Sequence, residues 1–262
     1  MSIVGVFDSG IGGLSILNEA LIQAPHHHYL YLADSANAPY GEKSSDWVSD
    51  RSLRLCSWLV DQKCEAIVVA CNTATAEAIS RIREKYPTIP IIGVEPGIKP
   101  ASSISQTKVV GVLATQNTLK SEKFKQLLSS LTQDCEFIQQ AGNGLVPLIE
   151  QGILSGDSIS TLLHEYIDPM IAKGADTLVL GCTHYPFLLA SIQELFGDQL
   201  RIIDTSQAVV RQLMRFIDSG NPENLHSVDL YSTSNGESLL ALAQKLLHSN
   251  HQQPALAYTV SI

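Results

Sequence analysis

Cys71 and Cys182 each come directly after a short apolar run that is typical of a buried β-strand. A thiol ionises with a pKa of about 8.5, so a modest shift makes it a useful base close to neutrality. Cys71 also precedes a predicted helix, whose positive dipole end would favour a thiolate, and Cys182 has the same placement with His184 two residues further on. We therefore predict that these two thiols transfer protons to and from a ligand.

The remaining cysteines, Cys56, Cys64 and Cys135, lie within helical patterns or at a strand edge and are interpreted as small buried apolar residues. Five cysteines are an odd number, and their spacing matches neither a disulfide framework nor a CxxC metal motif. The sequence begins with a strand-like segment, without the basic leader and cleavage site of a signal peptide. We therefore expect reduced thiols in a cytoplasmic protein, with no metal site.

A glycine-rich turn, Asp8-Ser9-Gly10-Ile11-Gly12-Gly13, follows the first predicted strand. Its glycines permit a tight turn and a close approach of the backbone to a ligand. A dinucleotide or phosphate loop is the alternative, but the spacing is not GxGxxG, and GxxxxGK[ST] occurs nowhere in the chain. Because Asp8 would repel a phosphate and attract an ammonium group, the turn favours an ammonium-bearing ligand.

Short apolar runs alternate with longer helical patterns along the chain, which is typical of an α/β fold with mostly parallel sheets. Ligands of such folds bind at the carboxyl ends of the strands, where both thiols are predicted to lie. The predicted strands are Ile3–Phe7, Tyr29–Ala33, Ala66–Ala70, Ile91–Val94, Val109–Leu113, Glu136–Gln140, Thr177–Leu180, Arg201–Ile203 and Val228–Ser232. The predicted helices include Leu14–Ala24, Trp47–Gln62, Thr75–Tyr86, Leu162–Ala172, Phe187–Phe196 and Ala208–Ile217.

The chain also resembles itself. Residues 66–71 align with residues 177–182 at an offset of 111, and in both an acid (Glu65, Asp176) precedes the strand and a cysteine follows it. Residues 4–9 align with 110–115 at an offset of 106, and residues 91–95 align with 202–204 at an offset of 109. Two related halves or two generic α/β units would both give this pattern, but three pairs in one order favour related halves.

The repeat predicts two similar three-layer α/β domains. Residues 1–98 and 207–262 would form the first, with Cys71, and residues 99–206 the second, with Cys182. The Ser- and Pro-rich segment Gly97–Lys108 is the expected crossover, and the strand at Val228–Ser232 is expected to return to the first domain. Two halves facing each other, related by a pseudo-twofold axis, would bring both thiols to an interdomain cleft.

The bulk composition excludes several other classes of protein. The chain has 262 residues, of which 45% are hydrophobic and 16% charged, as in an ordinary folded protein. A formal net charge of −9 makes nucleic acid an unfavourable main partner. No segment has the length and apolarity of a membrane span.

Taken together, the motifs resemble those of the glutamate racemases of the aspartate/glutamate racemase superfamily. The match extends over nearly the whole chain, through Asp8–Gly13, Pro39-Tyr40-Gly41, Cys71-Asn72-Thr73-Ala74, Glu95-Pro96 and Gly181-Cys182-Thr183-His184-Tyr185-Pro186. The resemblance implies that Cys71 and Cys182 are a paired acid and base, assisted by Asp8 and His184, with Glu150 supporting the second side. It also implies a set of substrate contacts: Asp8, Ser9, Tyr40, Gly41, Asn72, Thr73, Thr183 and His184.

The resemblance implies interconversion of L- and D-glutamate without a cofactor. One thiol would act on each face of the α-carbon, Cys71 on D-glutamate and Cys182 on L-glutamate, and D-glutamate would supply peptidoglycan synthesis. A homodimer is expected. Two alternatives stay open: another racemase of the superfamily, such as an aspartate racemase, and a catalytically silent binding protein, acting for example on DNA gyrase.

The chain departs from the family pattern outside the expected catalytic set. Asn117 stands where the family usually has glycine, the turn containing Asn143 lacks a Cys-Pro pair, and Ser234-Asn235 lies in a segment that replaces a Thr-Gly-Asp ending. These departures concern loop geometry and subunit contacts, and the resemblance implies that activity is kept.

Overall fold

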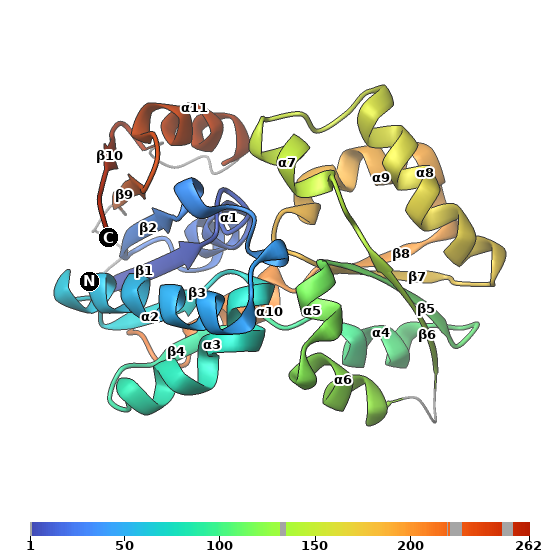
Figure 1. The fold of residues 1–262 in the computed structure, drawn as a ribbon, viewed down its shortest axis with the longest axis horizontal. Helices are drawn as coiled ribbons and strands as arrows, with labels where there is room; N and C mark the ends of the chain where they lie inside the picture. Colours follow the sequence, from blue (N-terminus) through green and yellow to red (C-terminus); the bar gives the residue numbers. More distant parts are fainter. Residues whose placement is uncertain (1, 132–134, 219, 221–226, 248–253) are drawn as a thin grey trace. The chain divides into compact units, whose positions relative to one another are not determined.

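The computed structural model describes residues 2–131, 135–218, 220, 227–247 and 254–262. The chain forms two compact units: unit 1 comprises Met1–Val94 and Ser206–Ile262, and unit 2 comprises Glu95–Thr205 (Figure 1). The units are defined by their internal contacts. The predicted division into one domain of residues 1–98 and 207–262 and another of residues 99–206 stays a prediction.

Unit 1 contains a six-stranded sheet in the order β10-β9-β2-β1-β3-β4, and all five pairs of neighbouring strands are parallel. The predicted parallel sheet is thereby confirmed, as is the return of the Val228–Ser232 strand, which pairs with β2. The strands are β1 (Ile3–Asp8), β2 (His28–Ala33), β3 (Ala66–Val69), β4 (Ile91–Gly93), β9 (Ser227–Ser232) and β10 (Ala257–Thr259).

Helices cover both faces of this sheet. On one face, α2 (Ser45–Asp61) and α3 (Asn72–Lys85) bury Leu59 and Ile79 in one core cluster with Leu30 of β2. Strand side chains alternate between faces, so Tyr29 points the other way, and its hydroxyl donates to the Ala24 carbonyl at the end of α1, 2.7 Å away. The helices of this second face are α1 (Leu14–Gln23), α10 (Ser206–Leu213) and α11 (Gly236–Leu246).

Unit 2 contains a four-stranded parallel sheet in the order β6-β5-β7-β8. On one face Ile98 and Phe124 form a core with Val110 and Val179. The elements are β5 (Val109–Ala114), β6 (Glu136–Ala141), β7 (Thr177–Gly181), β8 (Arg201–Ile203), α4 (Ile98–Ile104), α5 (Gln116–Lys120), α6 (Glu122–Ser129), α7 (Leu145–Glu150), α8 (Asp157–Ala172) and α9 (Leu189–Phe196).

The two sheets share strand order and register over four strands, β2-β1-β3-β4 and β6-β5-β7-β8. Val4 pairs with Ala66 in unit 1, and Val110 pairs with Thr177 in unit 2, as the offsets of 106 and 111 require. The third alignment is wrong, because Ile67 pairs with Ile91 and Leu178 pairs with Ile202. The equivalent of Ile91 is therefore Ile202, at an offset of 111, and the register supports two related halves.

Several elements differ from the prediction. The segment Gly97–Lys108, expected as the crossover, contains a helix that was not predicted, α4, which accommodates Pro100 in its first turn, where a helix needs no backbone N–H donor. The elements α5, α6, α7, α11 and β10 were not among the predicted elements. Within the described part of the chain, no helix has the length and apolar character needed to cross a membrane.

Candidate active site

Cys71 and Asp8 lie at the carboxyl edge of the unit 1 sheet, where neighbouring strands place them. Asp8 ends β1 and Cys71 follows β3, which pairs with β1. The Cys71 thiol, 5% exposed, lies 3.9 Å from the Ser9 hydroxyl, within hydrogen-bonding range for sulfur. The structure therefore brings together a thiol, a hydroxyl and a carboxylate that the sequence assigned to one site.

Cys71 is the N-cap residue of α3, as the sequence predicts. Asn72 begins the helix, and the Asn72 amide donates to the Val94 carbonyl at the end of β4, 3.4 Å away. Thr75 joins α3 to the ends of both β3 and β4. Its hydroxyl donates to the Val69 carbonyl at 3.1 Å and accepts from the Val94 N–H at 3.0 Å. The positive end of the helix dipole thus lies beside the sulfur, where it stabilises negative charge.

The glycine-rich turn packs closely onto the strand ends. One Asp8 carboxylate oxygen accepts the Gly13 N–H at 2.7 Å, and the Ser9 hydroxyl lies 3.3 Å from the other. A methyl group on Gly13 would come within 2.9 Å of the Ala70 side chain, so packing by itself requires a glycine here. A close approach of this turn to a ligand stays a prediction.

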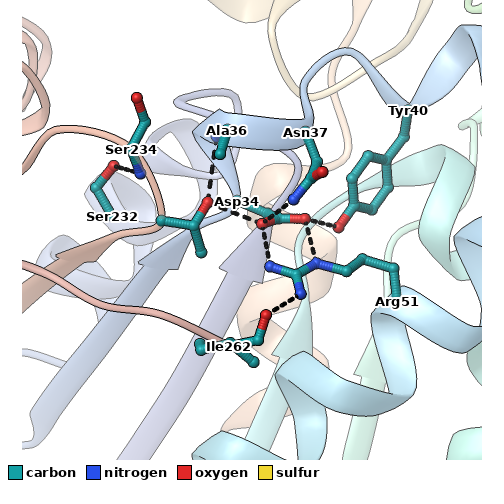
Figure 2. Close-up of polar contacts among 9 residues, drawn as sticks. Asp34, Ala36, Asn37, Tyr40, Arg51, Ser232, Ser234 and Ile262 are labelled. Atoms are coloured by element: carbon teal, nitrogen blue, oxygen red, sulfur yellow. Dashed lines mark hydrogen bonds and ion pairs between the residues drawn. The ribbon is translucent and has the colours of Figure 1, made fainter.

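Tyr40 and Gly41 lie in a single 3₁₀ turn, η2 (Tyr40–Glu42), which packs against α3. The Tyr40 side chain is buried, and its hydroxyl donates to the carboxylate of Asp34, which also pairs with Arg51 (Figure 2). Burial, the charge of Asp34 and this hydrogen bond raise the pKa of Tyr40 far above its ordinary value. Tyr40 is therefore a protonated donor whose hydroxyl is directed into the protein.

Asp34 and Arg51 were not predicted as site residues. A local signal existed for Arg51, because the helical period places it on the same face of α2 as the buried residues Val48 and Leu55. A charge on a buried helical face needs a partner, and Asp34 is that partner. Asp34 also had a local signal, because it directly follows the second predicted strand, at the carboxyl edge of the sheet where ligand-binding residues are expected.

In unit 2, Cys182, His184 and Glu150 form a relay at the carboxyl edge of the sheet. The Cys182 sulfur lies 3.7 Å from His184 Nδ1, and His184 Nε2 lies 2.6 Å from Glu150 Oε1. Cys182 follows β7 and Glu150 ends α7, so two elements meet at the imidazole. Thr183, between the two functional side chains, is also buried.

The charge state of His184 follows from its two partners. Burial alone lowers the pKa of His184, but its hydrogen bonds to Cys182 and Glu150, together with the charges of these groups, raise it well above the ordinary value. An imidazolium between a carboxylate and a sulfur stabilises negative charge on the sulfur. The arrangement can therefore support a thiolate that takes a proton from a carbon acid.

The helix expected directly after Cys182 is replaced by a 3₁₀ turn, η3 (Tyr185–Leu188), before α9 begins. Tyr185 N–H donates to the Cys182 carbonyl and Phe187 N–H to the His184 carbonyl, which are i→i+3 bonds. The predicted placement at the start of an α-helix is therefore wrong for Cys182. His184 supplies next to Cys182 the positive charge that the α3 dipole supplies next to Cys71.

Two tyrosines that were not among the predicted site residues hold the turn that leads into α7. The Tyr185 hydroxyl donates to the Gly142 carbonyl at 3.2 Å, and the Tyr166 hydroxyl donates to the Asn143 carbonyl at 2.7 Å. Gly144 then adopts a φ of 81° and begins the helix that ends at Glu150. The departure at Asn143 therefore lies in a turn fixed through its backbone, which leaves the Asn143 side chain outside these two bonds.

Each unit thus holds one of the two predicted site thiols, Cys71 or Cys182, with its own supporting groups. Unit 1 contains seven predicted site residues: Asp8, Ser9, Tyr40, Gly41, Cys71, Asn72 and Thr73. Unit 2 contains the other four: Glu150, Cys182, Thr183 and His184. Of the residues that the structure describes, none form a group of three or more His, Cys, Asp or Glu side chains arranged to hold a metal ion.

Known proteins share this sequence and fold. The profile of the Asp/Glu/Hydantoin racemase family matches residues 14–213. The glutamate racemase of Cupriavidus pinatubonensis is 51% identical over 97% of this chain and 94% of its own, and that of Ralstonia pickettii is 57% identical over 81% of this chain and 75% of its own.

Solved structures give the same result. Escherichia coli glutamate racemase, in complex with L-glutamate and the activator UDP-MurNAc-Ala, has a TM-score of 0.85 and 28% identity, over 99% of this chain and 98% of its own. Francisella tularensis glutamate racemase, in complex with D-glutamate, has a TM-score of 0.84 and 29% identity, over 99% and 97%. The chain therefore belongs to the Asp/Glu/Hydantoin racemase family, and within it to the glutamate racemases, isomerases that act on amino acids.

Proposed function

We propose that the protein interconverts L- and D-glutamate by a two-base mechanism in which Cys71 and Cys182 are the proton-transfer groups. One observation carries the proposal: each unit presents a buried thiol at the carboxyl edge of its sheet beside a stabilising positive group, the α3 N-terminus for Cys71 and His184 for Cys182. Relatives solved with D-glutamate and with L-glutamate supply the substrate class.

The α-proton of an amino acid is a very weak acid. A protein that removes it without a delocalising cofactor must place a base and an acid accurately and stabilise the developing charge. From D-glutamate, the Cys71 thiolate takes the α-proton and becomes a thiol, which leaves a planar carbanion. The Cys182 thiol then gives its proton to the opposite face, and L-glutamate leaves with Cys182 as the thiolate. The reverse reaction exchanges the two roles.

The supporting groups act on the charge of the two sulfurs. A protonated His184, held by Glu150, stabilises the Cys182 thiolate, and the α3 dipole stabilises the Cys71 thiolate. Asp8 and Ser9 lie beside Cys71, where Asp8 would attract the substrate ammonium group and Ser9 would bond a carboxylate oxygen. The mechanism requires both thiols to reach one α-carbon from opposite faces.

The proposal extends to the cellular role. D-Glutamate made by this reaction would supply peptidoglycan synthesis in the cytoplasm, and the active protein would be a homodimer. The solved Escherichia coli relative, which binds the activator UDP-MurNAc-Ala, supports a connection with cell-wall precursors.

Circular dichroism of purified, reduced protein incubated separately with L- and D-glutamate tests the activity. After dialysis against a chelator and without added pyridoxal phosphate, both enantiomers should approach the same racemic end point. L-Aspartate in a parallel reaction should keep its signal. Racemisation of aspartate but not glutamate, or loss of activity on dialysis with recovery on addition of a cofactor, would overturn the proposal.

A further inference from the structure

The carboxylate of Asp34 is fully buried and accepts five hydrogen bonds (Figure 2). Arg51 donates two of them in bidentate geometry, Nε to Oδ2 at 2.8 Å and Nη2 to Oδ1 at 2.6 Å. The Thr233 hydroxyl and the Asn37 amide donate to Oδ1 at 2.8 Å and 3.0 Å, and the Tyr40 hydroxyl donates to Oδ2. Such a charge remains buried only because its acceptor capacity is filled.

The donors come from segments far apart in the sequence. Asp34 follows β2, Arg51 lies in the middle of α2, and Thr233 follows β9, whose neighbour in the sheet is β2. Arg51 also donates through Nη1 to the backbone oxygen of Ile262. One ion pair therefore connects the carboxyl edge of the sheet, a covering helix and the segment after β10.

Tyr40 connects this network to the proposed catalytic thiol. Its hydroxyl is held by Asp34, and its side chain belongs to the same buried cluster as Cys71. The 3₁₀ turn that carries Tyr40 and Gly41 packs against α3, the helix that Cys71 caps. The position of this turn is therefore set from the Asp34 side by one hydrogen bond and from the Cys71 side by packing.

We propose that Asp34 and Arg51 are positioning residues that act through Tyr40, fixing the turn with Tyr40 and Gly41 against the Cys71 end of α3. This inference rests on the proposed racemisation and adds two residues to it that touch neither thiol. The bidentate pair fixes the direction of the carboxylate, and the carboxylate fixes the tyrosine ring. A lysine at position 51 would keep the positive charge but could not make the two parallel hydrogen bonds that the Arg51 guanidinium donates to Asp34.

A double-mutant cycle in kcat/KM for glutamate tests whether the ion pair acts through Tyr40. Tyr40→Phe and Arg51→Lys should each lower kcat/KM by roughly tenfold. The double variant should lose little more than the larger single loss, because both changes interrupt one pathway. Additive losses, about a hundredfold in the double variant, would mean that Arg51 does not act through Tyr40 and would overturn the inference.

The matched control is Asp176→Asn. Asp176 is another multiply bonded carboxylate, accepting from Ser105 and from the backbone of Gln106 and Thr107, but it precedes β7 and so lies at the opposite end of its sheet from Cys182. This variant should lower the thermal midpoint without lowering kcat/KM. If Arg51→Lys behaves in the same way, its role is structural only and the inference fails.

A second readout separates failure of this inference from failure of the proposed function. The rate at which iodoacetamide alkylates Cys71, followed by mass spectrometry of its peptide, needs no substrate. Tyr40→Phe, Arg51→Lys and the milder Thr233→Val should all change this rate relative to the parent, and Asp176→Asn should not. If the parent racemises no amino acid, the proposed function fails, and the effects of Tyr40→Phe and Arg51→Lys are then compared by the alkylation rate of Cys71 alone. Equal alkylation rates in the parent and all variants would overturn the inference.

Discussion

Glu150 bonds the nitrogen of His184 on the far side of the ring from Cys182, and we expect it to act on the thiol through this imidazole. The glutamate lies 2.6 Å from the far nitrogen of the imidazole, and its charge is one cause of the raised pKa of His184. A neutral side chain in its place would destabilise the imidazolium and, through it, the thiolate. His184 therefore provides the contact with the sulfur, and Glu150 provides the negative charge that keeps His184 protonated.

Glu150→Gln should consequently lower kcat/KM between about ten- and a hundredfold, since it weakens one general base without removing it. The two enantiomers have equal free energies, so the loss in kcat/KM must be the same in both directions of racemisation. Polarimetric rates from L- and D-glutamate measure this, with Glu150→Asp as the charge-preserving control. An unchanged kcat/KM in the glutamine variant would show that the carboxylate has no role in the relay.

At the scale of elements, acids at the amino ends of equivalent strands join neighbouring segments. Glu65, before β3, accepts the Ile3 N–H at 3.1 Å. Its equivalent before β7, Asp176, accepts the Ser105 hydroxyl at 2.6 Å and the Gln106 and Thr107 N–H groups. Each acid therefore holds the start of the strand that pairs with its own: Glu65 holds the start of β1, and Asp176 holds the segment that leads into β5.

Asp176 should contribute a pH-dependent part of the stability. Burial raises its pKa, but the hydrogen bonds that it accepts outweigh this and lower the pKa to about 2. A depressed carboxyl pKa stabilises the fold above the unfolded pKa of about 3.9, and this contribution, at most about 2 kcal/mol, is lost as the pH falls toward 2. The difference in thermal midpoint between parent and Asp176→Asn should therefore shrink from pH 6 to pH 2. A difference independent of pH would contradict this, and Glu122→Gln, in an exposed pair with Lys125, is the control that should change little.

The sequence pattern predicts the elements whose signal is local. The runs that became β1, β3, β5 and β7 are buried along their length, so apolar and β-branched residues mark them. The three-residue β10 is mostly exposed and depends on pairing with β9, which no local pattern records. Likewise the Asp34–Thr233 contact joins residues 199 positions apart, so no spacing could have indicated it.

At the scale of the whole molecule, each unit supplies one thiol to the proposed reaction. Under this proposal the two thiols would act on opposite faces of one carbon, so replacing either cysteine should stop racemisation but leave one half of the chemistry intact. Serine in place of either cysteine leaves a hydroxyl that is scarcely ionised near neutrality and so is a far poorer base. Both Cys71→Ser and Cys182→Ser should lose racemisation by orders of magnitude, because every turnover uses both groups.

Their partial reactions should differ. A glutamate analogue with a leaving group on the β-carbon needs only one deprotonation: the base takes the α-proton, the C–H electron pair forms the double bond, and the leaving group departs with its own pair. Cys71→Ser should keep elimination from the L-analogue, where Cys182 is the base, and Cys182→Ser should keep it from the D-analogue. Four elimination rates, measured by absorbance of the unsaturated product, decide the assignment. Two outcomes would contradict the assignment of one thiol to each face of the α-carbon. In one, either variant eliminates from the L- and D-analogues at equal rates. In the other, a variant loses elimination from both analogues together with thermal stability.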